Sequence, residues 1–88
     1  MVEKQYRVID DTGLHARHAA LIAKAAAAFQ SDIRIQYQDN QANLKSIMGV
    51  LSLGLPNGAD FKISVSGTDE QEALQEMDNI ITKEGLAV

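Results

Sequence analysis

The chain has 88 residues, of which 45% are hydrophobic and 23% are charged, with a formal net charge of −4 and no cysteine. This composition is typical of one small globular domain spanning residues 1–88, and it excludes disulfides and cysteine-based metal sites. The acidic balance argues against binding to nucleic acid or to an anionic membrane surface, because both select for basic patches. No apolar segment reaches the ~20 residues of a membrane span and no secretory signal opens the chain, so we expect a cytoplasmic protein.

The first part of the chain carries an alternating pattern followed by a helical one. Tyr6 and Val8 alternate with polar residues and predict a first strand, which ends at the turn of residues 10–13. Apolar residues then recur at spacings of three and four, which predicts a helix from about His15 to residues 30–32. The members of this apolar stripe are Ala19, Ile22, Ala23, Ala26 and Phe29.

The middle of the chain predicts a hairpin followed by a short helix. Residues 33–37 alternate between apolar and polar as a second strand, and a turn at residues 39–40 leads to a third strand at residues 42–44. Residues 45–52 predict a short helix with Ser46 as its N-cap, because a serine hydroxyl accepts a free N–H of the first helical turn.

The last part of the chain predicts a fourth strand and a closing helix. Residues 61–65 alternate between apolar and polar, as a strand with one buried face does. Thr68 and Gln71 have the spacing of a capping box, which predicts the start of the closing helix there. This helix is expected to stop at Gly85 and to bury a stripe that consists of Ala73, Leu74, Met77, Ile80 and Ile81.

The predicted order of elements is β-α-β-β-α-β-α. Strands with a single apolar face need a layer of helices to cover that face, and amphipathic helices need the sheet in return. We therefore predict an α+β fold, an open-faced two-layer β-sandwich in which three helices pack on one face of an antiparallel four-stranded sheet.

The junction between the first strand and the first helix carries the residues best suited to chemistry. A helix that begins near His15 presents N–H groups without partners, and its dipole adds partial positive charge, so this end favours an anion. Ser, Thr, Asp and Asn are absent from residues 13–18, and Arg17 adds a permanent cation. These features predict a nucleophilic imidazole beside an anion site. In the alternative, Thr12 caps the helix, His15 and His18 lie on its solvent face, and Arg17 only improves solubility.

The segment Gly13-Leu14-His15-Ala16-Arg17, before the first helix, and the segment Asn43–Val50, at the second, together resemble the HPr family, the histidine phosphocarriers of the bacterial sugar phosphotransferase system. Residues 83–86 are also similar to the Gram-positive members. The resemblance implies that His15 accepts a phosphoryl group through Nδ1 from phosphorylated Enzyme I and passes it to a sugar-specific Enzyme IIA domain. It implies a carrier that is not itself an enzyme and that uses no cofactor.

The residues around His15 account for such chemistry in physical terms. The N–H groups near Ala16, Arg17 and His18, together with the Arg17 guanidinium, are expected to bind the phosphoryl oxygens. The same positive potential disfavours the imidazolium form, so we expect a neutral, nucleophilic His15 ring near pH 7, since an ordinary histidine has a pKa of ~6.5.

The same resemblance implies that Ser46 is the regulatory phosphorylation site of an ATP-dependent HPr kinase/phosphorylase. A phosphate there adds about 1.5 to 2 negative charges, and in the family this state blocks Enzyme I docking and serves as co-effector of a catabolite-control transcription factor. We expect a monomer. The expected docking surface for partner proteins consists of Ala20, Lys24, Ile47, Met48 and Leu51.

One residue departs from the family pattern, because the family usually has proline at the position of His18. A proline in a first helical turn has no N–H and fixes φ, whereas His18 restores the donor. His18 also brings a second imidazole one turn from His15, which raises the question of a competing phosphoryl acceptor.

Two other functions stay open. A regulatory binding module similar to the catabolite-repression paralogue Crh would act mainly through phosphorylated Ser46, although the presence of His15 argues against it. A metal-binding protein would use His15 and His18, but two imidazoles without cysteine or a converging carboxylate make a poor site. We therefore predict no metal.

Overall fold

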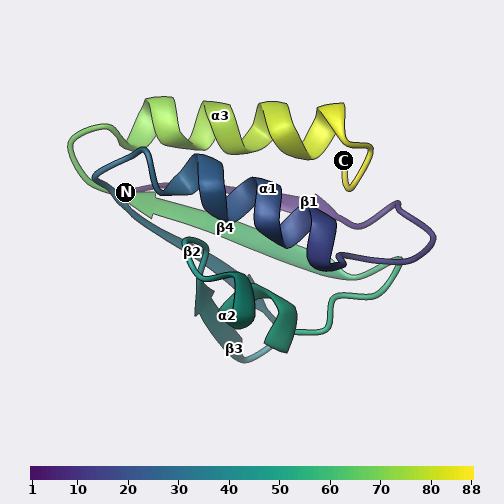
Figure 1. Ribbon diagram of the computed structural model, residues 1–88. Coiled ribbons are helices and arrows are strands. Elements are labelled where there is room, and N and C mark those ends of the chain that lie inside the picture. Colours follow the sequence, from purple (N-terminus) through teal and green to yellow (C-terminus); the bar gives the residue numbers. More distant parts are fainter.

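The computed structural model describes residues 1–88 as four strands and three helices in the predicted order. The strands are β1 (Val2–Arg7), β2 (Asp32–Tyr37), β3 (Asn40–Asn43) and β4 (Asp60–Ser66), and the helices are α1 (Ala16–Ala26), α2 (Ile47–Ser52) and α3 (Glu70–Lys83). Helices α1 and α3 lie side by side across the sheet, and α2 packs against α1 and β3 (Figure 1). No helix combines the length and the apolar character that crossing a membrane requires.

The sheet is antiparallel throughout, with the strand order β1-β4-β2-β3. Strand β4 is central and pairs Val65 with Val2 on one side and with Ile33 on the other. A strand with neighbours on both sides and helices on one face must bury every second residue, and Phe61, Ile63 and Val65 are buried accordingly. The predicted open-faced α+β sandwich is confirmed.

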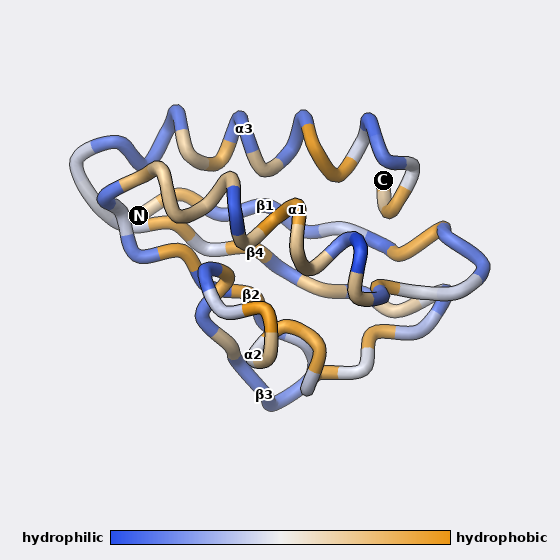
Figure 2. Tube along the Cα trace, viewed as in Figure 1, coloured by the Kyte–Doolittle hydropathy of each residue, from blue (hydrophilic) through white to orange (hydrophobic).

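The core lies between the sheet and the helices. Figure 2 shows the hydrophobic positions of α3 turned towards the sheet and its hydrophilic positions turned away, as expected for an amphipathic helix. Tyr6 on β1 stacks on Phe61 with ring centroids 5.3 Å apart, and its hydroxyl donates to Asp78 of α3 at 2.8 Å. The predicted helical stripes are largely correct, since Ala19, Ile22, Ala23, Ala26, Ala73, Met77 and Ile81 are all buried.

Two predicted boundaries are wrong. Helix α1 ends at Ala26, several residues before the predicted stop, and the Nζ of Lys45 donates to the carbonyl of Phe29 at 2.7 Å in the segment that follows. Strand β3 is Asn40–Asn43 and not residues 42–44, although the N–H of Leu44 still donates to the carbonyl of Ile33 at 2.8 Å just beyond the end of the strand. Leu44 itself is fully buried.

The predicted capping box of Thr68 and Gln71 is also wrong, because the N-cap of α3 is Asp69. The Asp69 carboxylate accepts from the N–H of Gln30 at 2.9 Å, from the N–H of Ser31 at 3.0 Å and from the Ser31 hydroxyl. These bonds lower the pKa of Asp69, chiefly through the Ser31 side chain and then through the Gln30 N–H. Asp69 therefore joins the start of α3 to the loop before β2.

Two backbone contacts position the loop that precedes α1. The N–H of Leu14 donates to the carbonyl of Leu55 at 2.9 Å, and Gly13 has a φ of 75° at this close approach, where a Cβ would collide with that carbonyl oxygen. The N–H of Ile9 donates to the carbonyl of Leu86 at 2.8 Å. The end of α3 is thereby brought next to the beginning of α1.

Candidate functional site

His15 is the N-cap of α1 and is accessible at the surface. Its backbone is extended, with φ −112° and ψ −175°, and the helix begins at Ala16. The N–H groups of Ala16 and Arg17 donate to no atom of the chain. The positive end of α1 therefore faces solvent beside the His15 imidazole, and its free N–H groups favour the binding of an anion there.

His18 is a buried residue and not a surface one, since it is only 2% exposed. The N–H of His15 donates to Nδ1 of His18 at 3.3 Å, and the N–H of His18 faces the His15 side chain without forming a hydrogen bond. The two ring centroids lie 4.1 Å apart, with the rings tilted by 44°. The alternative that places both histidines on the solvent face is therefore wrong for His18, whose ring takes the part that a Gln or Glu side chain plays in a capping box.

Asp10 lies on the other side of the His18 ring. Its Oδ2 is 3.5 Å from Nε2 of His18, and its Oδ1 accepts from the Thr12 N–H at 2.9 Å and from the Thr12 hydroxyl at 2.7 Å. The bonds from Thr12 lower the pKa of Asp10. A neutral imidazole that accepts at Nδ1 carries its proton on Nε2, so the protonated ring nitrogen of His18 is the one that lies next to this carboxylate. Thr12 thus binds Asp10 and does not cap α1.

Burial lowers the pKa of His18, and the neighbouring His15 lowers it further. The carboxylate of Asp10 opposes this effect and Arg17 adds to it. The ring is consequently neutral at pH 7, as its acceptor role at Nδ1 requires.

Arg17 extends from the first turn of α1 and is bound to α3. Its Nη2 lies 2.8 Å from Oε1 of Glu84, the C-cap residue of α3, and the Arg17 side chain is 67% exposed. The guanidinium that the sequence predicts as a phosphoryl ligand is therefore paired with a carboxylate in this state. The pairing keeps the cation close to the open end of α1.

Ser46 is the N-cap of α2, as predicted, and its hydroxyl accepts from the N–H of Gly49 at 3.0 Å. The next two residues, Ile47 and Met48, are exposed by 43% and 76%. Ala20 and Lys24 are exposed on α1, which packs against α2, whereas Leu51 is half-buried against the core. Leu21 is a further exposed apolar residue of α1 that was not predicted to belong to this surface.

Two residues of the site were not foreseen in these positions. Asp10 had a local indication, because an Asp two residues before a Thr is typical of a turn closed by its side chain. Glu84 had none, since its proximity to Arg17 depends on how the end of α3 returns to the loop before α1.

Asp10, His15 and His18 are also the one cluster whose side chains approach metal-site spacing, with one ligand atom from each within 4.8 Å of the others. The expectation that no carboxylate converges on the two imidazoles is therefore wrong, because Asp10 does. Both nitrogens of His18 are already committed, one as acceptor for His15 and one as the N–H facing Asp10. A metal ion would have to remove the cap of α1 to gain a lone pair, so this donor set does not suit a metal.

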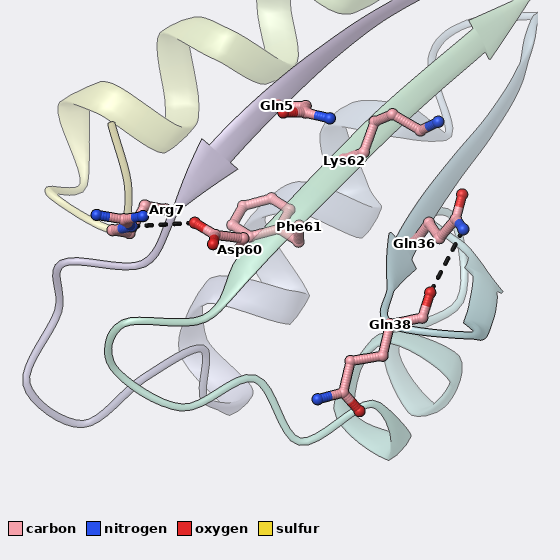
Figure 3. Close-up of a pocket in the computed structure, with 7 residues that line it drawn as sticks. All are labelled: Gln5, Arg7, Gln36, Gln38, Asp60, Phe61 and Lys62. Carbon is pink, nitrogen blue, oxygen red and sulfur yellow. Dashed lines mark hydrogen bonds and ion pairs between the residues drawn. The ribbon is translucent and has the colours of Figure 1, made fainter.

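A hollow on the open face of the sheet has a different character (Figure 3). It is polar, and its lining includes an ion pair of 3.0 Å between Arg7 and Asp60. Its lining comes from the strands and the turn after β2 and consists of Gln5, Arg7, Gln36, Gln38, Asp60, Phe61 and Lys62. It contains no residue of the site at α1, which lies on the helical side.

Comparisons with known proteins identify a family match and several similar solved structures. The family profile described as the PTS HPr component phosphorylation site matches residues 2–83. The histidine-containing phosphocarrier protein of Mycoplasma has 34% sequence identity and a TM-score of 0.95, with 97% of each chain covered.

Two further solved structures represent two kinds of relative. HPr of Thermoanaerobacter tengcongensis has 39% identity and a TM-score of 0.89, covering 97% of this chain and 96% of its own. Crh of Bacillus subtilis, a catabolite-repression protein crystallised as a domain-swapped dimer, has 38% identity and a TM-score of 0.74, covering 96% and 97%.

Proposed function

The chain belongs to the HPr family of phosphocarrier proteins, and on this premise we propose that it accepts a phosphoryl group on His15 from Enzyme I and passes it to Enzyme IIA domains. The observation that carries the proposal is the accessible His15 ring at a helix N-terminus whose Ala16 and Arg17 N–H groups have no partner. A phosphoryl group on that ring would find both donors and the helix dipole in place. No chemistry beyond accepting and donating this group is assigned to the protein itself.

The transfer step needs little from the protein besides position and charge. A lone pair of the His15 imidazole attacks phosphorus, while the bond from phosphorus to the donor atom breaks and its electron pair leaves with the donor. The incoming oxygens carry more negative charge than the Glu84 carboxylate, so Arg17 is expected to shift from Glu84 towards them. The site remains open to solvent, which suits a carrier that must release its cargo.

The same geometry argues against His18 as a competing acceptor. Its side chain is 2% exposed and its Nδ1 lone pair is occupied by the N–H of His15. A phosphoryl donor would need to unfold the start of α1 to reach it. His15 is therefore the proposed acceptor.

We further propose that Ser46 is the site of regulatory phosphorylation by HPr kinase/phosphorylase. The proposal is supported by its place immediately before the exposed Ile47 and Met48, because a phosphate there adds charge beside an apolar surface. This surface, with Ala20, Lys24 and Leu51, is the proposed docking site for Enzyme I, Enzyme IIA and a catabolite-control transcription factor. A cytoplasmic monomer remains the expectation, and sedimentation equilibrium would test the oligomeric state.

A Crh-like role, in which phosphorylated Ser46 acts without phosphoryl transfer, is the second candidate because of the similarity to Crh. Incubation with Enzyme I and phosphoenolpyruvate separates the two functions. A carrier gains one acid-labile phosphoryl group per chain and the His15→Ala variant gains none, whereas a purely regulatory protein gains none in either form. Intact mass before and after mild acid treatment gives the measurement.

A further inference from the structure

We propose that Asp10 and His18 form a positioning pair for His15, in which the Asp10 carboxylate selects the ring tautomer of His18 and the His18 ring fixes the backbone and the imidazole of His15. This inference rests on the proposed function of His15 and names two further residues for it. Neither side chain touches the phosphoryl group.

The pair is fixed at both ends. Thr12 donates twice to Oδ1 of Asp10, at 2.9 Å and 2.7 Å, and so leaves Oδ2 turned to His18. The His18 ring is 2% exposed, so packing leaves it little freedom to rotate. Burial and hydrogen bonds together give the pair one arrangement.

The contacts of His18 then determine the geometry of His15. Its Nδ1 accepts the His15 N–H at 3.3 Å, which satisfies the N-cap donor and sets the direction in which the chain enters α1. The centroid of the His18 ring also lies 4.1 Å from that of the His15 ring. The His18 ring therefore limits the orientations of the His15 imidazole, which must attack phosphorus.

Only one tautomer of His18 can do this. With the proton on Nε2, the ring accepts from His15 and donates towards Asp10, whereas a proton on Nδ1 would place two donors against each other. Asp10 favours the first form because a carboxylate accepts and never donates at neutral pH. Removing the Asp10 carboxylate should therefore change the orientation of the His15 ring indirectly, through His18.

The charged groups facing His18 come from several elements. Asp10 and Glu84 favour its protonated form, whereas His15, Arg17 and burial disfavour that form. At neutral pH the balance leaves a neutral ring, and the positioning contact to His15 is intact.

The test is a double-mutant cycle on phosphorylation by Enzyme I and phosphoenolpyruvate at pH 7.5, with Asp10→Asn and His18→Gln. Asn at position 10 retains an amide oxygen for the two Thr12 bonds, and Gln at position 18 supplies a carbonyl acceptor that has no tautomer to select. Asp11→Asn, an exposed neighbour, is the matched control. Thermal melts accompany each variant.

We expect Asp10→Asn to lower the kcat of Enzyme I for phosphorylation of this chain by about tenfold, while the KM for the chain stays unchanged. The reason is that docking is intact, whereas the orientation of the His15 ring is lost. In the His18→Gln background the same substitution should have no further effect. A role in stability alone would reduce the folded fraction and so raise the apparent KM at constant kcat.

Three results would overturn the inference: unchanged kcat in Asp10→Asn, an equal loss in Asp11→Asn, or the same loss when His18 is Gln. Failure of the proposed function looks different, because the unsubstituted chain would then gain no phosphoryl group in any background.

Discussion

The Nη2 of Arg17 lies 2.8 Å from Oε1 of Glu84, so the cation nearest the open end of α1 is paired with a carboxylate when no phosphoryl group is present. The Arg17 side chain is 67% exposed, and solvent therefore weakens the pair to the range of surface salt bridges, about 0.2 to 1 kcal/mol. A phosphoryl group on His15 would compete with Glu84 for the same guanidinium.

Substitutions of Arg17 and of Glu84 are therefore expected to shift the phosphoryl-transfer equilibrium in opposite directions. Arg17→Ala should move the equilibrium with Enzyme I away from the phosphorylated chain, and Glu84→Gln should move it towards that form, each by no more than about fivefold. The measurement is the fraction of phosphorylated chain at equilibrium with a fixed amount of phosphorylated Enzyme I. Glu76→Gln, an exposed acid of α3 without a bond, serves as control. Shifts of Arg17→Ala and Glu84→Gln in the same direction would contradict the competition.

His18→Ala should destabilise the fold, because it removes a buried ring and leaves the His15 N–H without an acceptor. The expected loss is about 1 to 3 kcal/mol in the free energy of unfolding. His18→Pro should be more stable than His18→Ala by about 0.4 to 1 kcal/mol, because proline restricts the unfolded chain. Urea denaturation measures both, with Lys24→Ala as an exposed control on α1. A loss in His18→Ala no larger than that in the control would show that the ring does not support the helix.

Asp69 should contribute to the dependence of stability on pH. Hydrogen bonds from Ser31 and Gln30 lower its pKa in the folded chain, so its contribution is present above the unfolded pKa of about 3.9 and is lost as pH falls through the folded value. Asp69→Asn should have a lower Tm than the unsubstituted chain at pH 7, and the difference in Tm between the two should become smaller towards pH 3. Melts from pH 7 to pH 3 test this, with Asp39→Asn as control, since Asp39 is exposed in the hairpin turn. A difference in Tm that is the same at pH 7 and at pH 3 would show that Asp69 does not contribute to the dependence of stability on pH.

For Ser46, a pair of variants separates charge from capping. Ser46→Asp and Ser46→Asn both preserve an N-cap acceptor for the Gly49 N–H, so Tm should stay close to that of the unsubstituted chain in each. Only Ser46→Asp adds a negative charge beside Ile47 and Met48, and it should weaken Enzyme I binding several-fold. Titration calorimetry gives the affinities. Equal affinity of the two variants for Enzyme I would show that negative charge at position 46 does not control docking at this surface.

The fold was predictable from the sequence because its strands and helices have clear periodicity. The alternation at residues 61–65 corresponds to the central strand, and the stripe from Ala73 to Ile81 corresponds to the buried face of α3. The start of α3 was not predictable, since Asp69 binds Gln30 and Ser31, residues that are distant in sequence.

At the site, His15, Arg17 and Ser46 were predicted from local motifs, and the structure places each of them at a helix start. The burial of His18 was missed, because helical spacing alone does not show that the chain before α1 covers that face of its first turn. Glu84 was missed for a similar reason, since a salt bridge between α1 and α3 leaves no pattern in either segment.

The assignment of His15 as the phosphoryl acceptor is tested most directly by mapping the phosphoryl group after reaction with Enzyme I and phosphoenolpyruvate. Phosphorus NMR of the intact chain should show a single phosphohistidine, and mass mapping under non-acidic conditions should place it on His15 with His18 unmodified. The expectation follows from the accessible His15 ring and from the 2% exposure of His18. A phosphoryl group on His18, or full labelling of His15→Ala, would contradict the assignment of His15 as the acceptor.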